Sequence, residues 1–413
     1  MLTNYCIMKT KKRKPKPKFT FKKLVLLLFV SAVIGVAVFL LLPSNYYVQR
    51  ALIHRMPKID QYGIFHNRVV SADDPQPWDF ANDVENKVIA PDFASDFAKY
   101  KTVAFVVIQH KKVMLEQYWD NYSPLSLSNS FSMSKSLVSL LVGCAITDGY
   151  IKSVNQPVHD FLPEWTSFDG KSLTIKDLLT MSAGVDWDET YNSLFSKTTE
   201  AYYGKDLWKL TQTEKLIEKP GVRFNYQSGA VQILAFLLQK ATGENISTYA
   251  SEKIWTPIHA ESDALWSLDH KDGMEKAFCC FNSNARDFAR LGQLVLNKGS
   301  WDDVQVVDSN YIREATTPAS WLEYTPTLLD GKTISPTTVP CNFYGYQFWL
   351  LNYHGLKITY LRGIMGQYVF IIPELDAVIV RLGKKCDTDY DMEQNYPKDI
   401  DTWLNAGMEV INR

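Results

Sequence analysis

The stretch SFSMSKSLVSLLVGCAITDG, residues 130–149, has the most regular helical pattern of the chain. Its apolar residues recur at i, i+3, i+4, i+7 and i+8, which is one face of a helix: Leu137, Leu140, Leu141, Cys144 and Ala145. Asp148 and Gly149 follow and are typical of a helix end. The spacing therefore predicts an amphipathic helix over residues 131–147, with Ser132 at its start.

Segments with the composition of β-strands lie on both sides of this helix. Two of them, residues 102–109 and 112–119, are separated only by His110 and Lys111, which predicts a hairpin. Three more are expected near the C-terminus, at residues 356–362, 366–372 and 376–382. Further helices are expected at residues 174–181, 229–241, 284–297 and 398–411.

This order of elements predicts an α+β fold. The two N-terminal strands and the three C-terminal strands can form one antiparallel β-sheet that is flanked by helices. The last helix would cover one face of the sheet, and the long helical segment in the middle would pack against the other face as a large insertion. A chain of 413 residues is long enough to bury such a core.

The N-terminus has the pattern of a membrane anchor. Residues 1–42 contain nine Lys or Arg and no acidic residue, and residues 24–42 form an uncharged apolar run of nineteen. As a helix this run is about 28 Å long, enough to cross a bilayer. No Ala-x-Ala cleavage site follows it, which favours an uncleaved signal anchor. The positive-inside rule then predicts a cytoplasmic N-terminus in the inner membrane and a periplasmic or extracellular remainder.

The rest of the chain is acidic. The formal net charge of −1 includes the basic tail, and without residues 1–42 the chain has 35 basic and 45 acidic residues. This charge argues against a nucleic acid as partner. No zinc-binding or nucleotide-binding spacing occurs, so we expect no cofactor and no metal.

Five of the six cysteines follow the apolar run, and an odd number leaves at least one thiol free. Cys144 is expected to be a buried small hydrophobic residue. A bridge between Cys279 or Cys280 and Cys341 or Cys386 is one pairing that the sequence leaves open.

Ser132 and Lys135 are candidates for chemistry. A serine hydroxyl needs a base within hydrogen-bond reach to become a good nucleophile. Residues i and i+3 share a helix face, so Lys135 can reach the Ser132 oxygen, and burial would lower the lysine pKa. A Ser-x-x-Lys spacing is weak evidence by itself, but this one opens the most regular helix directly after a hairpin.

These residues and several later blocks resemble the penicillin-recognising serine hydrolases, which include class C β-lactamases, DD-peptidases, related esterases and 6-aminohexanoate-dimer hydrolases. SFSMSKSLVSLLVG is similar to the nucleophile helix, and GVRFNYQSGAVQILAFLLQKATG contains a Tyr-x-Ser second motif. LRGIMGQYVFIIPELDAVIV lies where the third motif belongs. The resemblance covers about residues 100–410 and implies a β-lactamase/transpeptidase-like fold.

The resemblance also implies a role for each matching residue. Ser132 would be the acylated nucleophile, Lys135 its base, and Tyr226 the group that passes a proton to the leaving group. Ser228 would help to orient Lys135 or the substrate. The backbone N–H groups of Ser132 and Ile364 would form the oxyanion hole.

The third motif departs from the family pattern of Lys or His, then Thr or Ser, then Gly. Leu361, Arg362 and Gly363 stand there, so the first cation and the hydroxyl are missing and only the glycine remains. Gly363 would leave room for a substrate along the strand edge. Strand alternation places Arg362 on the face opposite to Leu361 and Gly363, where it could bind a carboxylate or face solvent.

The sequence therefore predicts four segments: a cytoplasmic tail (1–23), a membrane anchor (24–42), a lead-in (43–98) and a hydrolase domain (99–413). The function expected is hydrolysis of an amide or ester, in a small molecule or a cell-envelope component, through a Ser132 acyl-enzyme. One alternative is a cell-wall DD-peptidase or a β-lactamase. Another is a non-catalytic anchored sensor or scaffold. The substrate and the oligomeric state are left open.

Overall fold

The N-terminal hairpin that the sequence predicts forms two neighbouring strands of the main sheet. The computed structural model describes residues 20–165, 172–326, 337–392 and 394–413. Strands β3 (Thr102–Gln109) and β4 (Lys112–Tyr118) pair antiparallel across a two-residue turn. His110 and Lys111 both have positive φ, 51° and 58°, as a tight turn between twisted strands requires.

Both ends of the chain contribute to this sheet, as expected. Its strand order is β12-β13-β14-β15-β3-β4-β2. The C-terminal strands β13 (Leu356–Gly363), β14 (Gln367–Ile372) and β15 (Ala377–Gly383) form an antiparallel meander, and β15 pairs with β3. The prediction of five antiparallel strands is incomplete: β12 (Trp349–Tyr353) adds one edge, and the short β2 (Asp79–Phe80) pairs parallel with β4 at the other edge.

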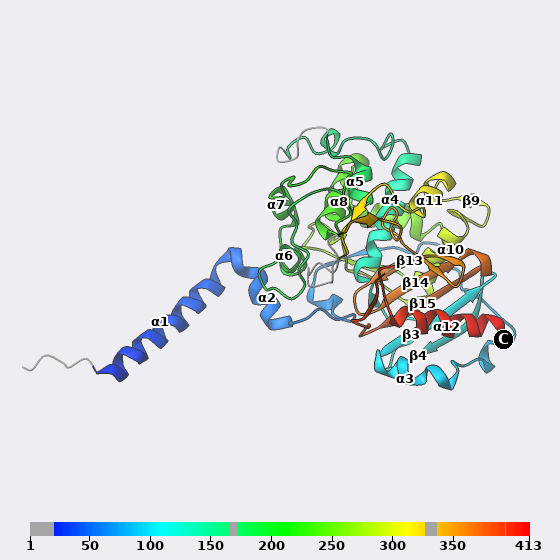
Figure 1. Ribbon diagram of the computed structural model, residues 1–413, viewed down its shortest axis with the longest axis horizontal. Helices are drawn as coiled ribbons and strands as arrows, with labels where there is room; N and C mark the ends of the chain where they lie inside the picture. The colour runs from blue at the N-terminus through cyan, green and yellow to red at the C-terminus, as the bar shows by residue number, and fades with distance from the viewer. Residues whose placement is uncertain (1–19, 166–171, 327–336, 393) are drawn as a thin grey trace, which may run out of the picture.

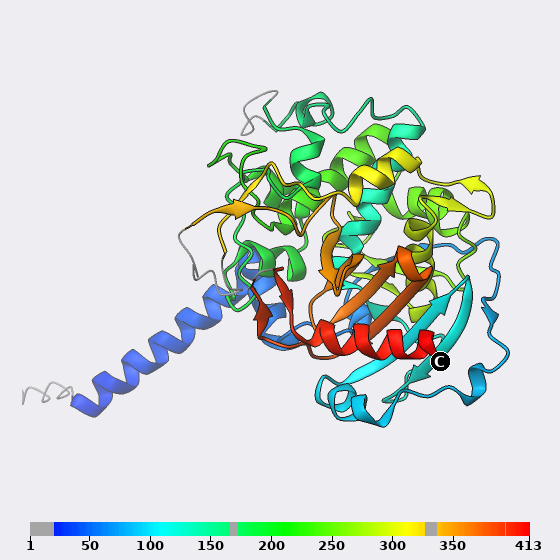
Figure 2. The same cartoon turned by 45° about the vertical axis from the view of Figure 1, so that its right-hand side comes forward.

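Helices cover both faces of the sheet (Figure 1). The C-terminal helix α12 (Asp399–Asn412) and α3 (Pro91–Lys99) pack on one face, and α10 (Ala285–Leu296) packs on β14 and β15 on the other. A Cβ on Gly292 would lie 2.7 Å from the side chains of Val369 and Val378, so glycine lets α10 approach the sheet closely. The helical insertion lies on the α10 side (Figure 2).

The central helix of the insertion is α4 (Ser134–Thr147), which follows a 3-10 turn at Phe131–Met133. The sequence predicts this helix, but it is buried on every side and has no solvent-facing polar stripe. Its serines hydrogen-bond to the surrounding protein instead: Ser136 donates to the Gln347 carbonyl at 2.6 Å, and Ser139 lies 3.0 Å from the Tyr311 hydroxyl. Helix α8 (Ser228–Thr242) packs beside α4.

The segment before the hairpin is more regular than the sequence predicts. It contains α2 (Tyr46–His54), β1 (Asn67–Val70) and α3. Strand β1 pairs with β6 (Ala264–Ser267) of the insertion, and α2 packs against α6 (Lys197–Tyr203). The elements are too short for a clear periodic pattern, and their apolar residues Ala51, Val70 and Phe97 belong to the common hydrophobic core.

Helix α1 (Phe21–Leu41) extends away from the rest of the molecule (Figure 1). It has a mean hydropathy of 3.1 over its most apolar window and buries none of its residues. It is long and apolar enough to cross a membrane, a property shared by signal sequences near the N-terminus. Most of the basic tail lies in residues 1–19, outside the described residues.

The cysteines do not form the bridge that the sequence left open. Cys279 and Cys280, neighbours in the chain, form a disulfide with each other. Cys341 and Cys386 are free thiols, because they belong to other parts of the fold. Cys144 is free and buried, as expected.

Candidate active site

Ser132 and Lys135 meet at the start of α4. Ser132 lies in the 3-10 turn before the helix, and Lys135 Nζ donates to its Oγ at 3.0 Å. The lysine side chain is only 1% exposed, and its Nζ also donates to the Phe278 carbonyl at 2.6 Å. Burial lowers the pKa of Lys135 to about 8, although the negative charge of Glu189 acts in the opposite direction. An amine with this pKa is partly neutral near pH 7 and can accept a proton.

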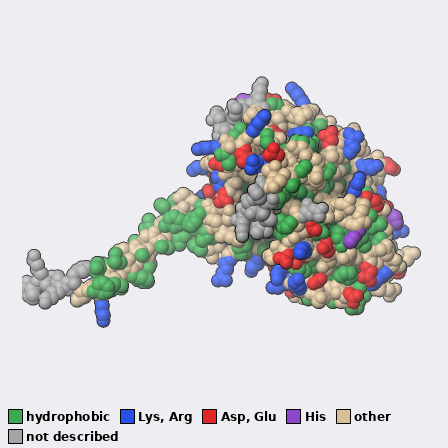
Figure 3. All heavy atoms as spheres, viewed as in Figure 1, with side chains coloured by type: hydrophobic (Ala, Val, Ile, Leu, Met, Phe, Trp, Pro, Cys, Tyr) green, Lys and Arg blue, Asp and Glu red, His purple; other side chains and the backbone are tan. Residues whose placement is uncertain are grey.

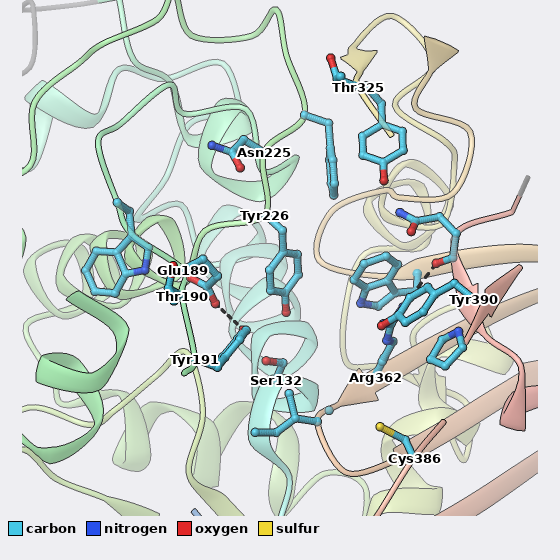
Figure 4. Close-up of a pocket in the computed structure, with 18 of the residues that line it drawn as sticks. Ser132, Glu189, Thr190, Tyr191, Asn225, Tyr226, Thr325, Arg362, Cys386 and Tyr390 are labelled. Atoms are coloured by element: carbon cyan, nitrogen blue, oxygen red, sulfur yellow. Dashed lines mark hydrogen bonds between the residues drawn. The ribbon is translucent and has the colours of Figure 1, made fainter. Parts of the chain in front are cut away.

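Tyr226 lies over the same pair of groups. Its ring centroid is 5.2 Å from Lys135 Nζ, and its hydroxyl points toward Ser132 (Figure 4). Burial raises the pKa of Tyr226, and a side-chain hydrogen bond with Ser132 opposes this shift. The phenol is therefore protonated at neutral pH and able to donate. Trp349 of β12 supports the ring, with centroids 5.6 Å apart.

Ser228 contacts a different partner from those that the resemblance implies. Its Oγ donates to Glu189 Oε1 at 2.7 Å, and its backbone N–H donates to Glu189 Oε2 at 2.7 Å. Ser228 is the first residue of α8, so the carboxylate caps a helix N-terminus, where negative charge is favoured. The Tyr191 hydroxyl also donates to Glu189 at 2.5 Å. Glu189 thus joins α8 to the loop that carries Tyr191.

The end of β13 packs directly against the turn that carries Ser132. A Cβ on Gly363 would overlap the Ser130 carbonyl oxygen and lie 3.3 Å from Phe131 Cβ. Backbone therefore fills the side of Gly363 where a Cβ would point, and Gly363 still lines the cavity above Ser132. Ile364 follows in the turn to β14, and Gln367 holds that turn by donating to the Ile364 carbonyl at 3.2 Å and ties it to β15 by donating to the Gly383 carbonyl at 2.6 Å.

Arg362 is not a solvated edge residue. It does lie on the face opposite to Leu361 and Gly363, but a segment that includes β16 (Tyr390–Asp391) covers that face. The guanidinium lies 4.5 Å from the Trp349 ring centroid and 5.2 Å from that of Tyr390. It donates to the Tyr390 hydroxyl and, at 3.4 Å, to the Asn395 carbonyl. Arg362 is thus a cation in the wall of the cavity above Ser132.

Two cavities meet at Ser132. The larger, of about 580 Å³, is lined by groups that include Glu189, Tyr226, Trp349 and Arg362. Figure 4 shows Glu189 and Tyr191 on one side of it and Arg362 and Tyr390 on the other. Trp187 and Tyr191 also line it. The smaller, of about 290 Å³, shares Ser132, Tyr191 and Ile364 with the larger one.

Across the residues that the structure describes, His, Cys, Asp and Glu form no group of three or more that could hold a metal ion.

Comparison with known proteins shows which family the chain belongs to. A family model described as beta-lactamase matches residues 92–397. The chain belongs to the beta-lactamase family. The match includes both groups of sheet strands and the whole helical insertion between them, so this member is a serine hydrolase with a beta-lactamase/transpeptidase-like fold.

Named members of the beta-lactamase family are similar over most of the chain. The 6-aminohexanoate-dimer hydrolase of Paenarthrobacter ureafaciens is 27% identical over 316 residues, which are 72% of this chain and 76% of that protein. A provisionally assigned 6-aminohexanoate-dimer hydrolase from Bacillus anthracis has a TM-score of 0.68 at 19% identity and covers 86% of this chain and 92% of its own. A family VIII carboxylesterase has a TM-score of 0.59 at 17% identity, and the match covers 78% of this chain and 99% of the esterase. The two structures show a shared fold.

Sequence reasoning missed several groups in this beta-lactamase-family site. The Phe278 carbonyl that holds Lys135 is a backbone atom, so no side-chain pattern could reveal it. Glu189 stands among acidic residues that resemble a solvated loop, and its contact with Ser228 spans 39 positions. Tyr390 belongs to a short strand outside the family motifs. Only the fold brings these groups to Ser132.

Proposed function

We propose that this protein hydrolyses an amide or ester bond through a covalent acyl-enzyme on Ser132. Lys135 removes the hydroxyl proton while Ser132 Oγ attacks the carbonyl carbon. Tyr226 then protonates the leaving amine or alcohol as its bond to that carbon breaks, and Lys135 passes the serine proton on to Tyr226, so that both groups return to their starting states. Water adds to the acyl-enzyme, releases the carboxylic acid and restores Ser132.

The observation that carries this proposal is the hydrogen bond of 3.0 Å between Lys135 and Ser132. The lysine pKa of about 8 makes Lys135 a usable base near neutral pH. Intact nucleophile, base and proton donor in one place argue against a non-catalytic scaffold, because each of these polar groups is costly to bury without a function.

The backbone N–H groups of Ser132 and Ile364 are our candidates for the oxyanion hole. Both residues line the two cavities, and Gly363 fixes the distance between their backbones by direct packing. Donors held rigidly by packed backbone stabilise a developing oxyanion without reorganising. The side chain of Ile364 has no part in this role.

A cell-wall DD-peptidase or β-lactamase is the second candidate, and Arg362 is the observation in its favour. A cation in the cavity wall could bind the carboxylate that such substrates carry. The other family groups for this purpose are absent at Leu361 and Arg362, so we place amide and ester hydrolysis first. One relative is named a 6-aminohexanoate-dimer hydrolase, and not a β-lactamase or a peptidase, which supports the same order.

We also propose that α1 is an uncleaved anchor, with residues 1–23 in the cytoplasm and the segments from residue 43 onward outside the inner membrane. The apolar length of the helix and the basic tail support this topology. Protease protection of a C-terminal tag in sealed vesicles of known orientation would test it.

Two covalent probes test the mechanism. We would treat the full chain in detergent with a fluorophosphonate and, separately, with a fluorescent penicillin, and locate each adduct by peptide mass spectrometry. Ser132→Ala is the test variant, and Ser153→Ala, outside both cavities, is the control. A fluorophosphonate adduct on Ser132 without retained penicillin is expected. A stable penicillin adduct would favour the second candidate, and no adduct with either probe would contradict both.

A further inference from the structure

The smaller cavity has the character of a binding site for an apolar group. Its walls include Met56, Leu194, Tyr202, Tyr203 and Phe278, and it opens onto Ser132. Among the described residues that line it, Arg55 is the only charged one, and none is acidic. The Glu189 carboxylate behind this wall already accepts from Ser228 and Tyr191, so an ammonium group in the cavity would meet no carboxylate in the lining. The cavity therefore fits a neutral apolar chain attached to the reacting carbonyl.

The positions of Tyr226 and Arg362 decide which part of a substrate each cavity receives. Both line the larger cavity and not the smaller one. Tyr226 must face the leaving group to give it a proton, so the leaving group occupies the larger, more polar cavity. The acyl part, on the other side of the bond that breaks, then points into the smaller cavity. Tyr191, which lines both cavities, separates the two parts.

The smaller cavity is built in part by the segment that follows the apolar helix. Ala51 of α2 lines it, as do residues 55–57 directly after that helix. The Tyr203 hydroxyl donates to the Arg55 carbonyl at 2.6 Å and fastens this segment to the insertion. Only a 3-10 turn, Pro43–Asn45, separates α2 from α1. The wall that Ala51 and residues 55–57 contribute is therefore close along the chain to the point where it would leave a bilayer.

Apolar side chains are exposed around this point. Leu52, Ile53 and Met56 are 49%, 71% and 53% exposed, and Phe195 is 65% exposed. Phe195 contacts Phe39 of α1, with ring centroids 6.3 Å apart. Figure 3 shows hydrophobic side chains covering α1 up to its junction with the rest of the molecule. Such a surface, continuous with a membrane-spanning length of helix, would rest in the lipid interface.

We propose that the smaller cavity binds a neutral, unbranched acyl chain of about six to ten carbons, and that the enzyme takes such acyl esters or amides from the bilayer surface. The volume of 290 Å³ matches roughly ten non-hydrogen atoms at about 30 Å³ each. This substrate class rests on the proposed Ser132 acyl-enzyme. In the reaction the Ser132 Oγ–acyl bond forms, the acyl–leaving-group bond breaks, and the serine proton leaves on the departing alcohol or amine.

The test uses the full chain in lipid nanodiscs and a series of 4-nitrophenyl esters from acetate to dodecanoate. We expect kcat/KM to rise about fourfold for each added methylene until the cavity is full, between six and ten carbons. The hexanoyl ester should exceed the 6-aminohexanoyl ester by about tenfold or more, because the ammonium would be buried without a partner. Dioctanoylglycerol dissolved in the nanodisc should release octanoate, which tests supply from the bilayer.

Ala51→Phe fills the cavity and should remove the preference for long chains while acetate turnover persists. Leu52→Phe, one position along α2 and exposed, is the matched control and should leave the chain-length profile unchanged. If Ala51→Phe lowers the melting temperature, Met56→Trp narrows the cavity from an exposed position and should have the same effect.

The outcomes separate this inference from the proposed function. Hydrolysis that requires Ser132 but has no chain-length preference, or an equal loss for acetate and octanoate in Ala51→Phe, would overturn the acyl cavity and leave the acyl-enzyme standing. Turnover of dissolved esters without release from dioctanoylglycerol would overturn supply from the bilayer. Loss of both the Ser132 adduct and every Ser132-dependent hydrolysis would refute the proposed function together with this inference.

Discussion

The pH dependence of hydrolysis tests the role of Lys135 most directly. If Lys135 is the base, kcat/KM follows its neutral fraction and rises as pH passes through a pKa of about 8. That fraction is about 9% at pH 7 and about 90% at pH 9, so the rate should rise about tenfold and then level off. A lysine with its usual pKa of 10.5 would give about a hundredfold rise over the same interval and no plateau.

A substitution of Glu189 tests whether charge in the site controls the pKa of Lys135. Its negative charge raises the pKa of Lys135 against the larger effect of burial, so Glu189→Gln should move the rising limb to lower pH. The amide keeps the size of the side chain that accepts from Ser228 and Tyr191. Glu218→Gln is the matched control: Glu218 lines the same cavity but pairs with Arg223 at 3.7 Å. Its profile should coincide with that of the wild type.

The assay is hydrolysis of 4-nitrophenyl hexanoate from pH 6 to pH 10, corrected for the rate with Ser132→Ala. A rate that is flat across this range would refute Lys135 as the base. If the rising limb of the pH profile moves to higher pH in Glu189→Gln, the proposed effect of Glu189 on the pKa of Lys135 is refuted.

Three further outcomes are expected. Tyr226→Phe should lower kcat about 10²–10⁴-fold with an unchanged melting temperature, because the ring still packs on Trp349 and only the proton donor is lost. Gly363→Ala should lower both kcat and the free energy of unfolding, the latter by about 1–3 kcal/mol in urea, because its Cβ overlaps the Ser130 carbonyl. Lys135→Met should abolish turnover and raise the free energy of unfolding at pH 7 by up to about 3 kcal/mol, since the lowered pKa means that burying the ammonium is unfavourable. That gain should be full below about pH 8, shrink as pH rises from 8 to 10.5, and vanish above 10.5, where unfolded and folded lysine are both neutral.

The sequence predicted the parts of the fold whose periodic pattern is local. Residues 131–147 read as a helix because their apolar spacing repeats, and the hairpin at His110 and Lys111 has strands long enough to recognise. The parallel edge strand β2 has two residues and therefore no pattern. Strand β16 also has only two residues and no recognisable pattern. The sequence therefore could not predict that this strand covers Arg362.

Site residues were predictable where they share a turn of helix and not where the fold joins distant segments. Ser132 and Lys135 are three positions apart, so helix geometry sufficed. Ser228 was expected near Lys135, but its partner is Glu189, held there by a loop whose path depends on tertiary packing. The smaller cavity combines Ala51 with Phe278, more than two hundred positions away, and no local pattern encodes that pairing.

The pairing of β15 with β3 has a consequence for how the protein is made. Val106 lies opposite Val380, so the middle of the sheet must wait until nearly the whole chain has left the ribosome. Contacts of such large sequence separation slow folding, and until β15 arrives one edge of the N-terminal hairpin is open to other chains. Formation of the C-terminal strands also brings Gly363 against Ser130. The turn that carries Ser132 therefore reaches its final packing only after these strands have paired. A nascent chain tethered by its first helix would therefore remain catalytically silent until synthesis is almost finished.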